Sequence, residues 1–394
     1  MKLLHVHDFF APGNSRYGHD ICRKLVLRGH EVHVLAAVGE RGPADGAVVD
    51  GVRFHTYRQY DGAGAFKRYR YVIGRNKTIF SELQRIHCFD VVLFNQPLCY
   101  HGVRQSPIVA EVRRRYAFIS PWADEWKAAH DPEGGGLFRG IARRVNLSTR
   151  NRMEGRALRE CSGVSVISDF VKNRLLQLHP ETPPEKLHSI PCAVDTDMFC
   201  PTPGWRERHA IPPGDTLLLT IRRLVPRMGV DNLIRAFPEV LASIPSARLV
   251  IGGEGPLRGE LEALARSLPC ADRVLFTGYV ADAEMPAIYS AADLFLLPTK
   301  ELEGFGMVII EAMACGTPVL GTPVGAIPEV LGPFDRSMLC SGVGHREIAE
   351  GLLRLFRSGI SNDDMRQRCR QYAVDRYGWD VILPRFESFL CGKA

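Results

Sequence analysis

The stretch Glu301–Val319, which reads ELEGFGMVIIEAMACGTPV, contains a single carboxylate inside a long apolar run. Gly304–Gly306 predicts a strand-to-helix turn, and Gly316–Pro318 predicts the end of the helix that follows. Within that helix, Glu311 needs a partner, because a charge in an apolar environment is costly when it is left alone. The stretch therefore predicts a glycine turn and a buried helix that carries a partnered carboxylate.

A second carboxylate, Glu303, precedes Glu311 by eight residues and lies at the expected amino end of this helix. Eight helical residues span about 12 Å, which is about the reach from the hexose to the ribose of a sugar nucleotide. The free N–H groups and the positive dipole at a helix amino end favour a diphosphate between the two carboxylates. The alternative is that Glu301 and Glu303 only complement the helix dipole, while Glu311 makes a structural hydrogen bond.

The segments on both sides of this stretch alternate apolar strands with amphipathic helices. The expected strands are Leu3–Val6, Glu31–Ala37, Val91–Asn95, Tyr116–Ser120, Val164–Ser168, Thr216–Ile221, Ala247–Gly253, Arg273–Val280, Asp293–Pro298 and Pro318–Pro323. The expected helices are Tyr17–Leu27, Val230–Ile244, Gly259–Leu268 and Met307–Cys315. This order predicts the α/β class, with two doubly wound, Rossmann-like halves separated by a proline-rich linker, Cys200–Gly214. Ligands of such sheets bind at the carboxyl ends of the strands.

The composition agrees with this architecture, since 394 residues are long for one domain, and 45% hydrophobic with 24% charged residues is typical of a globular protein. Eleven cysteines without a C-x-x-C pair favour a reducing cytosol over a disulfide framework. We expect neither a signal peptide nor a membrane span, and hence a cytoplasmic protein. Residues 1–200 hold 29 basic and 21 acidic side chains, which suits an anionic acceptor, a membrane surface, nucleic acid or a solvated face.

The stretch Glu301–Val319 resembles the signature of the retaining family 4 glycosyltransferases (glycosyl transferases group 1, GT-B fold), in which two glutamates eight positions apart flank a Gly-Phe-Gly turn. Three further segments resemble the donor-binding half of that family: Ser246–Ala265, Ile288–Thr299 and Gly321–Gly332. The resemblance implies two domains that face a central cleft. Residues 1–199 would bind the acceptor and residues 200–374 the nucleotide-sugar donor, while a helix within residues 375–394 would pack back on the first domain.

The resemblance also implies roles for individual residues. Glu303 would handle the hydroxyls of the donor sugar, and Glu311 would hold the ribose. The backbone around Tyr279 would meet the nucleobase, although this side chain is equally consistent with a place in the core. The remaining donor-side residues implied in this way are Gly13, Gly253, Gly278, Val280, Gly304, Phe305, Gly306 and Met307.

The stretch Arg222–Asp231, RRLVPRMGVD, follows an expected strand. In the family this loop supplies an arginine and, five residues on, a lysine, and both contact the donor diphosphate. Arg223 matches the arginine, whereas Met228 occupies the lysine position. Because each such charge-assisted bond contributes about 1.5–3 kcal/mol, we expect Arg227 to replace the missing cation, Arg222 to be solvated or to reach across the domains, and Met228 to pack under the loop.

The amino-terminal half departs further from the family. The histidine that the family tends to place after a strand, facing the donor sugar, is absent from Tyr116–Ser120. The candidates for contacts with the sugar or the acceptor are His7, Asn95, Trp122 and Asp124, and a strand histidine such as His7 is also often structural. Gly13 offers a close approach to a phosphate, and Ser15 is an equally good helix N-cap. Phe66–Phe80 and Gly136–Arg159 are basic and amphipathic, which suits anionic lipid, an anionic acceptor or solvent.

Together these features predict a retaining glycosyltransferase that moves a hexosyl-type group from a UDP- or GDP-sugar to a hydroxyl of a small-molecule, glycan or lipid-linked acceptor. The product would belong to glycoconjugate, polysaccharide or secondary-metabolite glycoside synthesis. We expect no cofactor and no required metal, because no D-x-D motif of the metal-dependent type is recognised and the helix amino end and the arginines supply positive charge. Peripheral contact with an anionic membrane is the expected exception to a cytoplasmic location, and no nucleic-acid module is recognised. The alternatives are a non-catalytic nucleotide-sugar-binding homologue and a sugar-nucleotide epimerase of the same fold.

Overall fold

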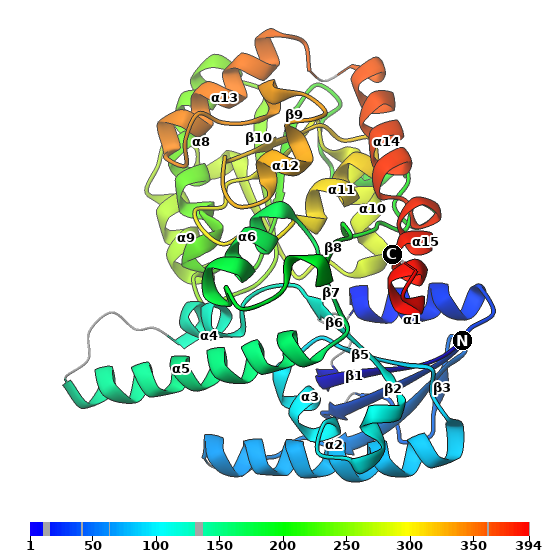
Figure 1. Ribbon diagram of the computed structural model, residues 1–394. Coiled ribbons are helices and arrows are strands. Elements are labelled where there is room, and N and C mark those ends of the chain that lie inside the picture. Colours follow the sequence, from blue (N-terminus) through cyan, green and yellow to red (C-terminus); the bar gives the residue numbers. More distant parts are fainter. Residues whose placement is uncertain (11–15, 41, 63, 131–136, 361, 394) are drawn as a thin grey trace. The chain divides into compact units, whose positions relative to one another are not determined.

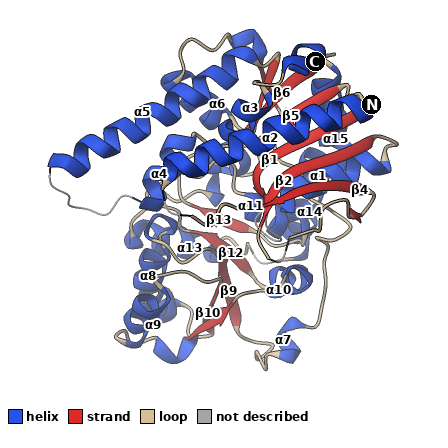
Figure 2. Cartoon of the chain, turned by 90° about the horizontal axis from the view of Figure 1, so that it is seen from below, coloured by secondary structure: helices blue, strands red, loops and turns tan. Residues whose placement is uncertain are grey.

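A computed structural model describes residues 1–394 apart from 11–15, 41, 63, 131–136, 361 and 394. Its contacts divide the chain into two compact units: unit 1 is Met1–Ile190 with Leu383–Ala394, and unit 2 is Pro191–Ile382. Each unit has its own predominantly parallel sheet (Figure 2), so the α/β class with two Rossmann-like halves is confirmed. The units divide at 190/191 and 382/383, rather than at 199/200 and 374/375.

Within the described residues, the sheet of unit 1 has eight strands in the order β3-β4-β2-β1-β5-β6-β7-β8. Figure 1 shows this sheet, with β1–β3 and β5–β8 labelled. Their bounds are β1 Lys2–Phe10, β2 Glu31–Val38, β3 Val48–Val49, β4 Val52–Arg58, β5 Val91–Phe94, β6 Arg113–Phe118, β7 Gly163–Val166 and β8 Leu187–Ser189. Neighbouring strands are parallel except β3 and β4. The β3–β4 hairpin turns through Asp50 and Gly51, which both have positive φ, as a two-residue hairpin turn requires.

Two layers of helices cover the sheet of unit 1. Their bounds are α1 Arg16–Leu27, α2 Ala65–His87, α3 Pro97–Val103, α4 Trp122–His130, α5 Leu137–Glu160 and α6 Asp169–Leu178. Buried side chains of α2, α3, α5 and α6 pack with Leu4, Val6 and their neighbours on one face. His5 points to the opposite face because side chains alternate along a strand, and there its ring meets Cys22 of α1.

Within the described residues, unit 2 has a five-stranded parallel sheet in the order β11-β10-β9-β12-β13. Its strands are β9 Thr216–Ile221, β10 Ala247–Gly252, β11 Val274–Gly278, β12 Leu294–Leu297 and β13 Val319–Gly321. Its helices are α7 Trp205–Arg208, α8 Val230–Ser243, α9 Arg258–Arg266, α10 Met285–Ala291, α11 Met307–Ala314, α12 Ile327–Leu331, α13 His345–Arg357 and α14 Asp363–Tyr377. Helix α8 packs against α13 and α9, and α11 packs against α14 and α10. The strands run as nearly continuous apolar sequences because both faces are covered.

The last helix, α15 Trp379–Cys391, passes from unit 2 into unit 1. Its carboxyl-terminal half is held by polar contacts within unit 1. The Glu387 carboxylate accepts hydrogen bonds from Arg28 and from the His30 ring, with His30 Nε2 at 2.8 Å. The Phe389 ring lies 5.0 Å from the guanidinium carbon of Arg115. Leu383–Ala394 is therefore part of the first unit.

Candidate active site

The carboxyl ends of the five strands of unit 2 meet at one edge of its sheet, because the strands are parallel. The loop after β9 lies against the loop after β10 there. Gly253 has φ of +111°, and a β-carbon at this position would lie 2.0 Å from the carbonyl oxygen of Arg222. Leu224 N–H donates to the carbonyl of Glu254 at 2.8 Å. Only glycine at 253 allows the two loops to approach this closely.

Arg222 and Glu303 form an ion pair between the end of β9 and the loop after β12. Arg222 Nη2 lies 2.5 Å from Glu303 Oε2, and the two side chains are 8% and 13% exposed. The Thr299 hydroxyl donates to the same carboxylate oxygen at 3.3 Å. A nearly buried guanidinium and a nearly buried carboxylate thus stand together at the edge of the sheet where a ligand is expected.

The expectation that Arg222 is solvated or reaches across the domains is wrong, because its side chain is largely buried and its partners lie within unit 2. Its Nη2 also lies 2.8 Å from the Met228 sulfur, and Met228 is 7% exposed. A lysine at 228 would bring a second cation against this guanidinium, and buried like charges repel strongly. The arginine at 222 and the thioether at 228 are therefore physically linked, and Met228 packs under the loop as expected.

The other two arginines of the loop differ in environment. Arg223 is exposed. Arg227 is half-buried, and its Nη1 donates to the carbonyl of Leu302 at 3.1 Å. The backbone joins the same two loops, since Lys300 N–H donates to the carbonyl of Arg227 at 2.8 Å. Arg227 thus braces the segment that leads to Glu303.

Helix α11 begins one residue after Gly306, which has the left-handed φ of +84°, and ends at Ala314. The turn and the helix are therefore as the glycines predict. The helical spacing of the two carboxylates is wrong, because the residues from Glu303 to Gly306 are not helical and the rise of 1.5 Å per residue does not apply to them. Glu311 is 5% exposed and accepts a hydrogen bond from the Tyr289 hydroxyl at 3.1 Å.

The remaining donor-side candidates fall into two groups. Phe305 is 5% exposed and its ring contacts Tyr377 edge to face at 5.7 Å, so it belongs to the core beneath the loop. Tyr279 is 68% exposed, which excludes the core position left open for it. Gly278 is buried at the end of β11, with φ of +73°. The half-buried candidates are Val280, Gly304 and Met307.

A third loop, after β13, completes this edge of the sheet. Gly325 has φ of +59°, and a β-carbon there would lie 2.1 Å from the Glu303 carbonyl oxygen. The N–H of Ala326 donates to that oxygen at 2.9 Å. The Thr322 hydroxyl donates to the carbonyl of Thr299 at 2.6 Å. The backbone of Glu303 is thus held from both sides, which fixes where its carboxylate can point.

Unit 1 contains a cavity of about 310 Å³ beside the carboxyl ends of β1, β5 and β6. Three of the four sequence candidates line it: His7, Asn95 and Trp122. The Asn95 amide oxygen lies 2.9 Å from His5 Nε2, and the His5 and His7 rings are 4.0 Å apart. The two histidines share one side of β1, as their alternation predicts.

The two histidines are held in a setting that disfavours their charged forms. Burial lowers the pKa of His5 to about 4, and burial together with the neighbouring His5 lowers the pKa of His7 well below its ordinary value. His7 Nε2 is buried and has no hydrogen-bond partner among the described residues. Both rings are therefore neutral near pH 7, and Nε2 of His7 is available to a polar group in the cavity.

Asp124 does not line the cavity, since its carboxylate makes two hydrogen bonds with Arg174, at 2.7 and 3.1 Å. Glu154, which the sequence did not single out, does line it. Glu154 is 1% exposed, accepts from the backbone N–H of Trp122 at 3.1 Å and lies 3.2 Å from His179 Nε2. Burial raises the pKa of the Glu154 carboxyl. The sequence signal for Glu154 is weak, because it is one carboxylate within the basic, amphipathic stretch Gly136–Arg159, which suits anionic lipid, an anionic acceptor or solvent.

Two further features of the sequence are the expected turn that contains Gly13 and Ser15 and the aspartate pair Asp195 and Asp197. Gly13 and Ser15 lie outside the described residues. Asp195 and Asp197 have the D-x-D spacing that is found in metal-dependent transferases, so the expectation that no such spacing occurs is wrong. The Asp195 carboxylate accepts the backbone N–H of Asp197 at 3.2 Å and of Met198 at 3.4 Å, so it shapes a local turn.

The basic helices α2 and α5 expose several apolar side chains. Phe66 is 72% exposed on α2, and Ile141 and Val145 are 52% and 61% exposed on α5. Arg150, by contrast, is buried against the Trp122 ring at 4.1 Å. Within the described part of the chain, no helix combines the length and apolar character needed to cross a bilayer.

Two family models match this chain, one over most of unit 1 and one over most of unit 2. The family model described as Glycosyltransferase Family 4 matches residues 11–198, and the model described as Glycosyl transferases group 1 matches residues 202–376. The chain is 31% identical over 239 residues to the GDP-mannose-dependent alpha-(1-6)-phosphatidylinositol monomannoside mannosyltransferase of Mycobacterium tuberculosis, covering 58% of this chain and 61% of that protein. The match thus spans about three-fifths of that relative. One subunit of human phosphatidylinositol N-acetylglucosaminyltransferase is 27% identical over 98% of this chain and 75% of its own length.

Solved structures agree on the fold. Sucrose-phosphate synthase of Thermosynechococcus elongatus superposes with a TM-score of 0.81 at 19% identity, over 100% of this chain and 98% of its own. The Anabaena protein HepE, solved in complex with UDP and glucose, has a TM-score of 0.75 at 18% identity and complete coverage of both chains. Since the family models cover both units and the fold is GT-B, the chain belongs to the family 4 glycosyltransferases, of the glycosyl transferases group 1.

Proposed function

We propose that the protein transfers a hexosyl group from a nucleoside-diphosphate sugar to an acceptor hydroxyl, with retention of configuration at the transferred carbon. The observation that carries the proposal is the Arg222–Glu303 pair beside the amino end of α11, at the carboxyl edge of the unit 2 sheet. That place combines a cation, a carboxylate and the amino end of a helix, which together suit a sugar linked to a diphosphate. Retention rests on the resemblance to a retaining family.

Arg222 is our candidate for the second cation of the diphosphate site, beside Arg223. The sequence favoured Arg227, but the guanidinium of Arg227 is directed at a backbone carbonyl. The guanidinium of Arg222 instead touches the side chain at 228, the position of the family's lysine. Arg222 can therefore deliver its charge to the same place from a neighbouring position, while its bond to Glu303 orients that carboxylate toward the sugar.

Charge development on the leaving diphosphate would be stabilised by these arginines and by the amino end of α11. Glu303 would bind sugar hydroxyls, and Glu311, held by Tyr289, would receive the ribose with little rearrangement. Tyr279, exposed at the end of β11, would line the base. Fixed donors of this kind substitute for a metal ion, so we propose that the reaction requires none.

The acceptor is proposed to bind in the cavity of unit 1, where His7 and Asn95 offer polar groups and Trp122 offers a ring. Two relatives carry phosphatidylinositol substrates in their names, which supports a lipid-linked acceptor and GDP-mannose as the first donor to test.

Phe66, Ile141 and Val145, exposed among basic residues, support peripheral contact with an anionic bilayer. Sedimentation with anionic but not neutral vesicles, weakened by salt, would test that contact.

The donor assignment is tested by thermal unfolding of the full chain with GDP-mannose, UDP-glucose and their free nucleoside diphosphates. We expect at least one sugar nucleotide to raise the melting temperature, and Glu311→Ala to reduce this rise. A protein that none of the nucleotides stabilises would contradict the proposal.

Turnover is tested separately by measuring release of nucleoside diphosphate with and without a phosphatidylinositol-type acceptor. Acceptor-dependent release excludes a binding protein without catalysis. Conversion of the donor without any acceptor would instead identify an epimerase of the same fold. Nuclear magnetic resonance of the product gives the anomeric configuration and tests retention directly.

A further inference from the structure

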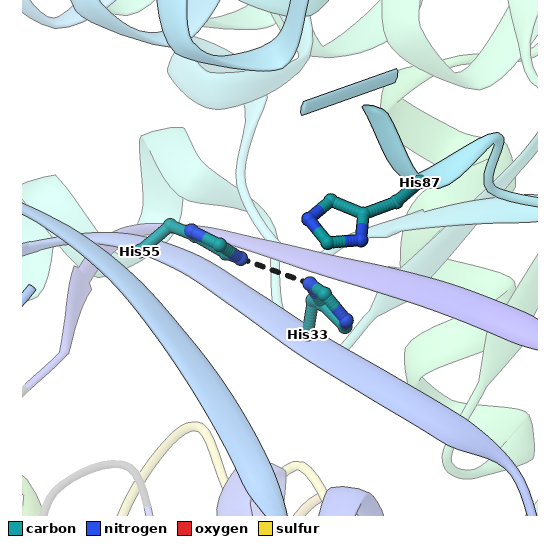
Figure 3. Close-up of side chains that lie close together, drawn as sticks. All are labelled: His33, His55 and His87. Atoms are coloured by element: carbon teal, nitrogen blue, oxygen red, sulfur yellow. Dashed lines mark hydrogen bonds between the residues drawn. The ribbon is translucent and has the colours of Figure 1, made fainter. Parts of the chain in front are cut away.

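Three histidines from separate parts of unit 1 converge on one point (Figure 3). His33 lies near the start of β2, His55 lies in the middle of β4 and His87 is the last residue of α2. Their ligand atoms all lie within 4.8 Å of one another. His33 Nδ1 and His55 Nε2 are 2.9 Å apart, and the ring centroids of His33 and His87 are 4.4 Å apart.

We propose that His33, His55 and His87 form a binding site for a divalent transition-metal ion, with Zn²⁺ as the ion to test. Imidazole nitrogens suit this class of ion, and three histidines with one open position are an established zinc ligand set. Two nitrogens on a tetrahedral Zn²⁺ ion, each at about 2.0–2.1 Å from it, stand about 3.3 Å apart. The pair at 2.9 Å is close to that spacing, and all three ligand atoms lie within 4.8 Å of one another. Binding therefore needs a small opening of the close pair and a closer approach of the third ring.

The contact with Glu31 turns the lone pair of His33 Nδ1 toward the centre of the cluster. The Glu31 carboxylate lies 3.1 Å from His33 Nε2 and 3.8 Å from His87 Nδ1. A carboxylate accepts a hydrogen bond from the ring nitrogen it faces, so His33 carries its proton on Nε2 and presents the Nδ1 lone pair to the other rings. In the metal-free cluster this lone pair accepts a hydrogen bond from His55 Nε2 at 2.9 Å, and a metal ion would take the place of that proton. A histidine ligand whose second nitrogen is held by a carboxylate in this way is the common arrangement at metal sites.

The surroundings also favour neutral ligands. His33 is 2% exposed and packs edge to face against Phe89 at 5.1 Å. A ring buried in this way is held in its neutral form, which is the form that binds a metal ion. His55 and His87 are partly exposed, which gives an ion a route from solvent.

The position of the cluster indicates a structural task. His33 lies toward the amino end of β2, and α2 ends where the chain turns back to enter β5. The amino ends of parallel strands lie at the edge of a sheet opposite its carboxyl ends, where the unit 1 cavity is. A metal ion here would fasten β2, β4 and α2 to one another. It would stabilise unit 1 without touching donor or acceptor, so the inference does not depend on the proposed reaction.

Binding is tested with the full chain after treatment with a chelator and gel filtration, by titration with Zn²⁺ against a chromophoric competitor. We expect one Zn²⁺ per chain. At a Zn²⁺ concentration of about 100 Kd, the melting temperature of unit 1 should rise by about 5–11 °C. Co²⁺ in place of Zn²⁺ should give the visible absorption of a tetrahedral complex. Because the buried His33 is needed for packing, the variants used are His55→Gln and His87→Gln, each expected to weaken Zn²⁺ binding at least tenfold.

Two controls separate this site from adventitious binding. His188→Gln removes a partly buried histidine outside the cluster, and Cys88→Ser removes the exposed thiol next to His87. Both should bind Zn²⁺ like the unaltered chain. Equal Zn²⁺ affinity in the unaltered chain and in the double variant of His55 and His87 would overturn the proposal. Loss of binding in Cys88→Ser alone would overturn it too.

Discussion

Arg222 and Glu303 lie 81 residues apart in the chain and form an ion pair that is almost closed to solvent. Such a pair contributes little net stability when it is intact, because both ions lose their hydration. Removing one partner is costly, since the other ion is then buried alone. The pair therefore ties the orientation of Glu303 to one guanidinium, and the exposed Arg223 is left for solvent or ligand.

At the scale of single residues, we predict that Arg222→Gln lowers kcat/KM at least tenfold. The donor site loses a charge-assisted bond of about 1.5–3 kcal/mol, and the Glu303 carboxylate is no longer oriented by an ion pair. Arg222→Lys should recover part of the loss. Arg227→Ala should cost less, since it removes a brace to the Leu302 carbonyl. Steady-state kinetics with melting temperatures measured alongside will check this. A larger fall in kcat/KM for Arg227→Ala than for Arg222→Gln would identify Arg227 as the second cation of the diphosphate site.

At the scale of elements, the loops at the carboxyl edge of unit 2 owe their closeness to glycines with positive φ. Gly253 brings the end of β10 against the Arg222 backbone, and Gly325 brings the loop after β13 against the Glu303 backbone. Both contacts are backbone to backbone, so no side-chain rearrangement can relieve a clash there. The strand ends are thereby locked in a fixed relation, on which the placing of the two charged side chains depends.

We predict that Gly253→Ala destabilises unit 2 by about 1–3 kcal/mol or more, because it combines an unfavourable φ with a contact of 2.0 Å to a carbonyl oxygen. Gly259→Ala is the matched control. It lies within α9, and its β-carbon would meet nothing within 4 Å, so a gain of about 0.5–1 kcal/mol is expected. Urea unfolding of both variants measures the difference. Equal stability of the two variants would show that the loops can separate freely.

At the scale of the whole molecule, buried histidines make stability depend on pH. The pKa of His5 is about 4 in the fold, against an ordinary value of 6.5, because of burial. Between those values the unfolded chain binds a proton that the folded chain does not, so the free energy of unfolding falls as the pH is lowered. Burial also lowers the pKa of His7 and of His101. Asp8 acts in the opposite direction, because burial raises its pKa to about 6.

We therefore predict that the free energy of unfolding falls between about pH 7 and about pH 5, because several histidines outweigh Asp8 over that range. Denaturant titrations followed by circular dichroism will measure it. His101→Gln, which removes one of these buried histidines, should flatten the dependence. A stability that rises toward pH 5 would mean that the raised carboxyl pKa values dominate instead.

The sequence by itself determined the alternation of strands and helices, the start and end of α11, and the loops that carry Glu303 and Arg223. Hydrophobic periodicity, glycine turns and local motifs encode these features within a few neighbouring residues. The sequence also contains Asp50-Gly51, which is a turn signal for the β3–β4 hairpin. The two strands were not predicted, because strand prediction rested on apolar runs and these strands are short or contain many polar residues.

Only the tertiary structure decided which side chains meet. The Arg222–Glu303 pair, the contact that explains Met228, the pairing of Asp124 with Arg174 and the convergence of His33, His55 and His87 all join residues from different elements. Their geometry depends on strand order and on which loops share an edge of a sheet. No local pattern carries that information, because side chains far apart in the chain come together only through the packing of whole elements.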